Sequence, residues 1–154
     1  MSVNSMPHIA FHFNAPDKLE YACRFIRKAL RKDAQVTVLA PMERLRQLSA
    51  KLWKFAGHEF LAHAVHGEDT EIFVLAPVVL VERVSESHQR DVLLNLGTEL
   101  PQGFEMFNKV VEVVSSFDEM DRSQARVRWK HYQNAGHQIE RFDLVVREGA
   151  GHGI

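Results

Sequence analysis

Residues 109–115 read Lys-Val-Val-Glu-Val-Val-Ser, and residues 125–136 read Ala-Arg-Val-Arg-Trp-Lys-His-Tyr-Gln-Asn-Ala-Gly. The first stretch is almost continuously apolar, which is typical of a strand buried on both faces of a parallel sheet. The second predicts a helix that begins at Ser116, has capping-box spacing to Glu119, and is closed by Gly136. A buried strand followed directly by a long helix is the repeating unit of an α/β fold.

This helix carries a stripe of positive charge. Arg122, Arg126 and Lys130 follow one another at steps of four, with Trp129 beside them and no acidic residue within the stripe. Like charges at this spacing repel by a few tenths of a kcal/mol per pair. The stripe therefore predicts an anion site, and the alternative is a solvated basic face that binds nothing.

The rest of the chain alternates in the same way between strands and helices. Strands are expected at 8–14, 35–40, 71–76, 78–82, 91–96, 109–114 and 137–147, helices at 17–32 and 42–55, and one helical turn at 104–107. This order predicts a single-domain, three-layer open α/β sheet, mostly parallel, with helices on both faces. The domain is expected to span residues 1–147, and residues 148–154, with three glycines, to form a flexible tail.

The composition excludes several classes of protein. A chain of 154 residues with 45% hydrophobic and 25% charged residues is typical of one soluble globular domain. Its net charge of −1 argues against a protein that mainly grips nucleic acid. We expect a cytoplasmic protein, because the sequence contains neither a long apolar span nor a signal peptide. Cys23 falls on the apolar side of a helix and is expected to be a buried thiol.

Enzymatic function is not favoured by the motifs. The first strand-to-helix turn, Asn14-Ala15-Pro16-Asp17, resembles the position of a phosphate loop, but it lacks glycine and carries an aspartate. His58, His63 and His66 match no strong zinc spacing, and no nucleophile elbow surrounds the serines at 115–116. We expect no cofactor and no metal. The alternative is a nucleotide- or metal-dependent enzyme on a Rossmann-like sheet.

Two features point instead to protein binding. The strand end at Val114 leads to the same corner as the stripe and Trp129, and an aromatic wall with flanking cations suits an acidic peptide with a hydrophobic end. Trp53 and Phe60 belong to a segment with more apolar surface than it can hide. They predict a protein interface, unless both pack inside the core.

The helix motif resembles that of the chi subunit family of bacterial DNA polymerase III holoenzyme. Residues 125–136 are similar to the family pattern A-R-x-R-[YW]-K-x-Y-x-x-A-G, and the segments Phe107–Val114, Arg90–Leu96 and Leu52-Trp53 follow in family order. Together the resembling segments run in family order over about two thirds of the chain. The tyrosine usual in the family is Trp129 here, which keeps the aromatic wall and loses a hydroxyl.

The resemblance implies an adaptor with no intrinsic activity, which contacts DNA only indirectly and no membrane. Chi proteins link the clamp loader to single-stranded DNA-binding protein by holding its acidic, phenylalanine-ended C-terminal tail. Carried over by position, the tail site consists of Val114, Arg122, Arg126, Trp129 and Lys130. The surface for the psi subunit or a helicase-like partner falls on Trp53 and Phe60.

Overall fold

One sheet of parallel strands forms the centre of the molecule. The computed structural model describes residues 6–55 and 61–145, and in these ranges every strand pairing is parallel, in the order β3-β4-β2-β5-β6-β1-β7. The strands are β1 (His8–Ala15), β2 (Val36–Leu39), β3 (Ala64–Val65), β4 (Val78–Val81), β5 (Val92–Asn95), β6 (Lys109–Ser115) and β7 (Ile139–Asp143). The predicted open α/β sheet is confirmed.

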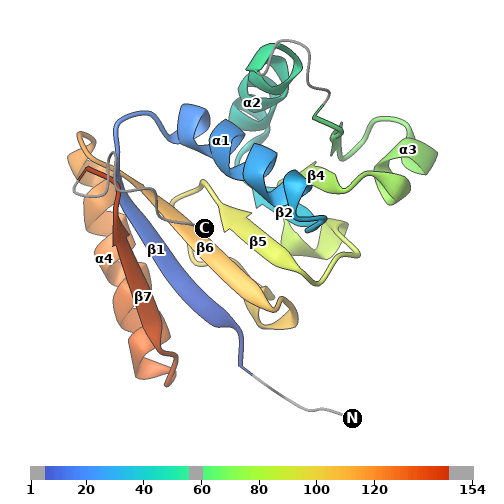
Figure 1. Ribbon diagram of the computed structural model, residues 1–154. Helices are drawn as coiled ribbons and strands as arrows, with labels where there is room; N and C mark the ends of the chain where they lie inside the picture. Colours follow the sequence, from blue (N-terminus) through green and yellow to red (C-terminus); the bar gives the residue numbers. More distant parts are fainter. Residues whose placement is uncertain (1–5, 56–60, 146–154) are drawn as a thin grey trace.

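Helices cover both faces of this sheet. They are α1 (Lys18–Arg31), α2 (Met42–Phe55), α3 (Thr70–Leu75) and α4 (Glu119–Asn134), with short 3-10 turns at Val84–Glu86 and Phe104–Met106. The first two pack on one face, against Val38, Leu94 and Val111, and lie in front of the sheet in Figure 1. The fourth packs on the other face, against Ile9 and Val110. Side chains alternate between the two cores, as the period of a strand requires.

The first helix begins where the sequence predicts. The Asp17 side chain accepts hydrogen bonds from the backbone N–H groups of Leu19 and Glu20 and so caps α1. Cys23 is fully buried in its apolar face, and burial raises the pKa of the thiol to about 11. The prediction of a buried thiol is confirmed.

The prediction that Ser116 caps the last helix is wrong. The cap is Asp118, whose side chain accepts from the N–H groups of Met120 and Asp121. Ser115 stabilises the turn before the helix, because its hydroxyl accepts hydrogen bonds from the backbone N–H groups of residues 117 and 118. The helix ends as predicted: Gly136 has a φ of +93°, and the backbone bonds from residues 136 and 137 to 133 and 132 form a Schellman motif.

The expected strand at residues 71–76 is also wrong, since this segment is the helix α3. Asp69 caps it by accepting from the N–H groups of Glu71 and Ile72. Only Phe73 of this helix is buried, and Leu75 is 83% exposed. An apolar run of this length fits a buried strand or a short helix equally well, and the aspartate before it decides the outcome.

Two further expectations concern membranes and the chain end. Within 6–55 and 61–145, no helix has the length and apolarity needed to cross a membrane. The expected tail at 148–154 lies outside the described residues.

Candidate functional site

An aromatic pocket lies where α4 crosses the ends of β1 and β6. It has a volume of about 430 Å³ and is lined by Phe11, Phe13, Val114, Arg122, Ala125, Arg126, Trp129 and Arg141. The Trp129 ring packs on that of Phe11, with ring centroids 5.0 Å apart. We call these eight residues the aromatic cup. It contains four of the five predicted tail-site residues.

Three guanidinium groups surround the apolar floor of the cup. Arg141, from β7, lies over the rings of both Phe13 and Trp129, at 5.2 and 5.8 Å from their centroids. Arg126 is exposed and makes no hydrogen bond or ion pair with any described residue. None of the described residues that line the cup carries a carboxylate. This combination of flat apolar walls and bidentate donors suits a ligand with an apolar group beside a carboxylate.

Arg122 is held more tightly than the other two arginines. Its Nη1 donates to Asn14 Oδ1 at 3.2 Å, and its Nε lies 3.6 Å from Glu119 Oε2. Asn14 in turn donates to Asp143 at the end of β7. Glu119 therefore partly neutralises the stripe, although the sequence interpretation found no acid in it. Arg122 serves as a fixed donor at the rim of the cup.

Lys130 does not line the cup. Its side chain is exposed on α4 and has no hydrogen bond or ion pair among the described residues. Lys130 follows Trp129 and lies on the outer side of the helix. From there its flexible side chain can reach only the edge of the site. Arg141, which the sequence did not suggest, is the third cation at the pocket wall, and the role of Lys130 in the tail site stays a prediction.

A buried ionic network fixes α4 beneath the cup. Glu112 of β6 is fully buried and accepts from Arg128 Nε at 2.9 Å, from the Tyr132 hydroxyl at 2.7 Å and from Asn95 Nδ2 at 3.0 Å. Arg128 also donates to the Thr98 carbonyl. Burial, and then the Glu112 carboxylate, raise the pKa of the Tyr132 hydroxyl well above its usual value. These bonds set the rotation of α4 and so the direction of Trp129.

The crevice between β1 and β6 is closed to phosphate. The chain leaves β1 toward α1 on one face and leaves β6 toward α4 on the other, which is where open parallel sheets usually bind ligands. Lys18 Nζ and Asp121 Oδ1 form a buried ion pair there at 3.0 Å, and Asp121 also accepts from the Ser115 N–H. Because aspartates occupy the N–H groups of both helix starts, this crevice lacks the donors that a nucleotide phosphate needs.

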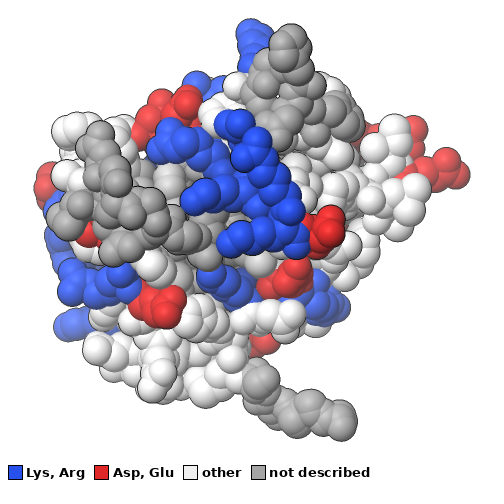
Figure 2. Space-filling view, in the orientation of Figure 1, with Lys and Arg blue, Asp and Glu red and all other residues white. Residues whose placement is uncertain are grey.

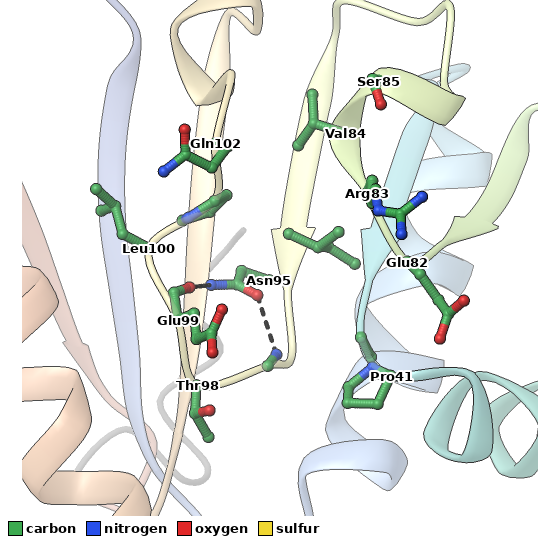
Figure 3. A pocket seen from close by; sticks show the side chains of 14 residues that line it. Pro41, Glu82, Arg83, Val84, Ser85, Asn95, Thr98, Glu99, Leu100 and Gln102 are labelled. Atoms are coloured by element: carbon green, nitrogen blue, oxygen red, sulfur yellow. Dashed lines mark hydrogen bonds between the residues drawn. The ribbon is translucent and has the colours of Figure 1, made fainter.

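A larger pocket of about 540 Å³ lies at the ends of β2, β4 and β5 (Figure 3). Glu82 and Arg83 form one wall, and Thr98 and Glu99 form the opposite wall. Glu82 accepts from the backbone N–H of residue 42 at the start of α2, and Asn95 bonds the Glu99 carbonyl and the Gly97 N–H. Two of the polar side chains at this pocket, those of Glu82 and Asn95, are therefore engaged in hydrogen bonds within the protein.

The histidines suggested as a metal site do not converge. His63 bonds the Ser49 hydroxyl and the Leu61 carbonyl, whereas His66 lies 3.5 Å from Glu86. His58 lies outside the described residues. Across the described ranges, no three His, Cys, Asp or Glu side chains are grouped as metal ligands.

The second predicted surface is described only in part. Trp53 is 59% exposed on α2, and its ring lies 5.0 Å from that of His63. It is therefore not a core residue. Phe60 lies outside the described residues.

Sequence reasoning missed Phe11, Phe13 and Arg141. Alternation in the first strand places Phe11 and Phe13 on one face, so their shared direction could have been found. Their position beside Trp129 depends on β1 lying between β6 and β7, which the sequence does not reveal. The network around Glu112 was missed because a single acid in an apolar strand has no spacing signal.

Comparison with known proteins gives a consistent result. The family model described as DNA polymerase III chi subunit, HolC, matches residues 6–140. The chain is 33% identical over 124 residues to the DNA polymerase III subunit chi of Pseudomonas aeruginosa, covering 80% of this chain and 84% of that protein. It is 25% identical over 118 residues to the protein of the same name from Haemophilus influenzae, covering 76% and 81%.

Proposed function

Because the chain belongs to the DNA polymerase III chi subunit family, we propose that its aromatic cup binds the acidic, phenylalanine-ended C-terminal tail of single-stranded DNA-binding protein. Membership makes the chain an accessory protein of DNA replication rather than an enzyme. In the proposed function it connects that tail to the clamp loader. The observation that carries the proposal is one apolar cup that has three guanidinium groups around it and no carboxylate among the described residues of its wall.

In this complex the terminal phenyl ring enters the cup and packs between Val114 and Trp129. Arg126, whose guanidinium is free of protein partners in the described ranges, binds the terminal carboxylate. Arg141 and the outlying Lys130 attract the aspartates upstream. Exposed ion pairs contribute only about 0 to 1 kcal/mol each, so burial of the ring must supply most of the affinity.

Calorimetric titration with a synthetic acidic peptide ending in phenylalanine tests the site. Arg126→Ala is expected to weaken binding about tenfold or more, because a charge-assisted bond to the carboxylate contributes about 1.5 to 3 kcal/mol. Arg83→Ala removes another exposed arginine, which follows β4 and does not line the cup, and serves as the matched control. The site assignment is wrong if Arg126→Ala and the control bind the peptide equally well.

Trp53 supports the proposal of a second docking surface, for a psi subunit, another clamp-loader component or a helicase-like partner. An indole that is 59% exposed on a helix is a typical anchor for a protein interface. Co-purification of the clamp-loader components from the source cells should be lost with Trp53→Ala and kept with Trp129→Ala. If both variants retain the same partners, Trp53 is not the anchor.

A further inference from the structure

Positive charge is segregated onto the layer formed by α1 and α2. Residues 18–32 and 42–55 contain ten of the 19 lysines and arginines but only two of the 20 acidic residues. These segments therefore carry a net charge of +8, and the remainder of the chain carries −9. The net charge of −1 conceals this division, so it cannot exclude a local polyanion site.

The charges form a ridge over α1 (Figure 2). We define the basic ridge as Arg24, Arg27, Lys28 and Arg31 of α1 together with Lys51 of α2. The four α1 residues have the spacing i, i+3, i+4 and i+7, which places them along one side of the helix. All are exposed except Arg27, which is half-buried.

Contacts between the helices bring the two sets of cations together. The Arg27 guanidinium lies over the Phe55 ring of α2, 5.9 Å from its centroid. Burial raises the pKa of the Cys23 thiol, and the charges of Lys51 on α2 and Arg24 on α1 both oppose that rise, so both cations lie near this thiol. Glu20, 3.9 Å from Arg24, is the acidic residue of α1. These contacts place cations of both helices on the same side of the molecule.

We propose that the basic ridge binds the phosphate backbone of single-stranded DNA. The ridge presents cations, whereas the apolar side chains of α1 point into the core. An acidic polypeptide held by exposed ion pairs alone would gain little and would need an apolar anchor such as the cup. A nucleic-acid strand needs no such anchor, because release of its condensed counterions drives binding at a row of lysines and arginines.

The ridge and the cup lie on opposite faces of the sheet, since α1 and α2 cover one face and α4 the other. Binding at the ridge is therefore independent of the tail site. A strand on the ridge leaves the cup open, so the two ligands can be bound together.

The test measures fluorescence anisotropy of a labelled oligothymidylate of about 20 nucleotides with the full chain, from about 50 mM salt upward. The variant Lys28→Gln/Arg31→Gln should weaken binding about tenfold or more and make the slope of log K against log salt shallower by about 1.4. The double variant Arg83→Gln/Arg90→Gln changes the net charge equally at exposed residues outside α1 and α2, and should bind as the unmodified chain does.

Three results would overturn the proposal that the ridge binds single-stranded DNA. They are no binding of the oligonucleotide at low salt, an equal loss of affinity in the two double variants, or competition by polyglutamate that is as effective as competition by unlabelled DNA. The last would identify an acidic protein as the partner. Because the ridge side chains changed are exposed, circular dichroism should show unaltered folding. Peptide binding at the cup, measured on the same variants, should be unchanged, so failure of this proposal and failure of the tail site are distinguishable.

Discussion

Trp129 is the residue on which the cup depends. It is half-buried, packs on Phe11 and carries the Arg141 guanidinium on its ring. It stands where the family usually has tyrosine, so the structure uses the larger ring without the hydroxyl. The indole therefore contributes apolar surface and shape to the site rather than a hydrogen bond at the tyrosine position.

Two substitutions at Trp129 test whether an aromatic ring at this position is what the peptide needs. Trp129→Ala should lower affinity for the phenylalanine-ended peptide by about 2 kcal/mol, which is typical of a central aromatic anchor. Trp129→Tyr should retain most of the affinity, because it keeps an aromatic wall. Titration calorimetry measures the affinity of both variants. If the tyrosine variant binds as weakly as the alanine variant, an aromatic ring at position 129 is not sufficient to bind the peptide.

The elements α4 and β6 act as one unit. The start of the helix is fixed by Asp118 and Asp121, its middle by Arg128 and Glu112, and its end by the Schellman motif at Gly136. Each of these contacts holds the helix against a strand or turn that also forms the cup. The site is thus positioned by helix caps and two buried ion pairs, Arg128–Glu112 and Lys18–Asp121.

The position of the cap predicts opposite results for two neighbouring residues. Asp118→Ala should lower the free energy of unfolding by about 1 kcal/mol, the usual cost of losing an N-cap. Ser116→Ala should change it by less than about 0.5 kcal/mol, because its hydroxyl makes only a 3.4 Å bond to the Ala15 carbonyl. Urea unfolding measures both, and the reverse order would contradict the cap assignment.

Loss of the buried carboxylate should cost far more. Glu112→Gln leaves the Arg128 guanidinium buried without its counter-charge, and we expect about 3 to 5 kcal/mol of destabilisation. Glu105→Gln, at an exposed acid in the turn before β6, is the control. Thermal unfolding of the two variants gives the comparison. A loss below about 1 kcal/mol for Glu112→Gln would mean that the pair does not hold α4.

The sequence predicted the sheet, both long front helices and the stripe, because period and capping are local properties. It misassigned residues 71–76 because a short apolar run has no distinctive period. It also could not place Phe11 or Arg141 beside Trp129, since that contact depends on strand order. Local patterns thus identified one wall of the cup, and the tertiary fold supplied the other.

At the scale of the whole molecule, the sheet separates two surfaces of different character. The cup, behind the sheet, combines an apolar floor with a few fixed cations. The basic ridge, in front of it, is an extended array of cations (Figure 2). Added salt should therefore lower the affinity of the ridge for DNA more steeply than the affinity of the cup for the peptide. The reason is that the cup derives most of its affinity from burial of apolar surface.

The fluorescence of Trp129 reports whether the cup holds a terminal phenylalanine and its carboxylate. In the variant Trp53→Phe, Trp129 is the single tryptophan of the chain. The acidic peptide with a free carboxyl end should shift its emission saturably to shorter wavelength, and the same peptide with an amidated end should require at least about tenfold higher concentration. Equal titration curves for the two peptides, or calorimetric binding without any change in Trp129 emission, would contradict the account.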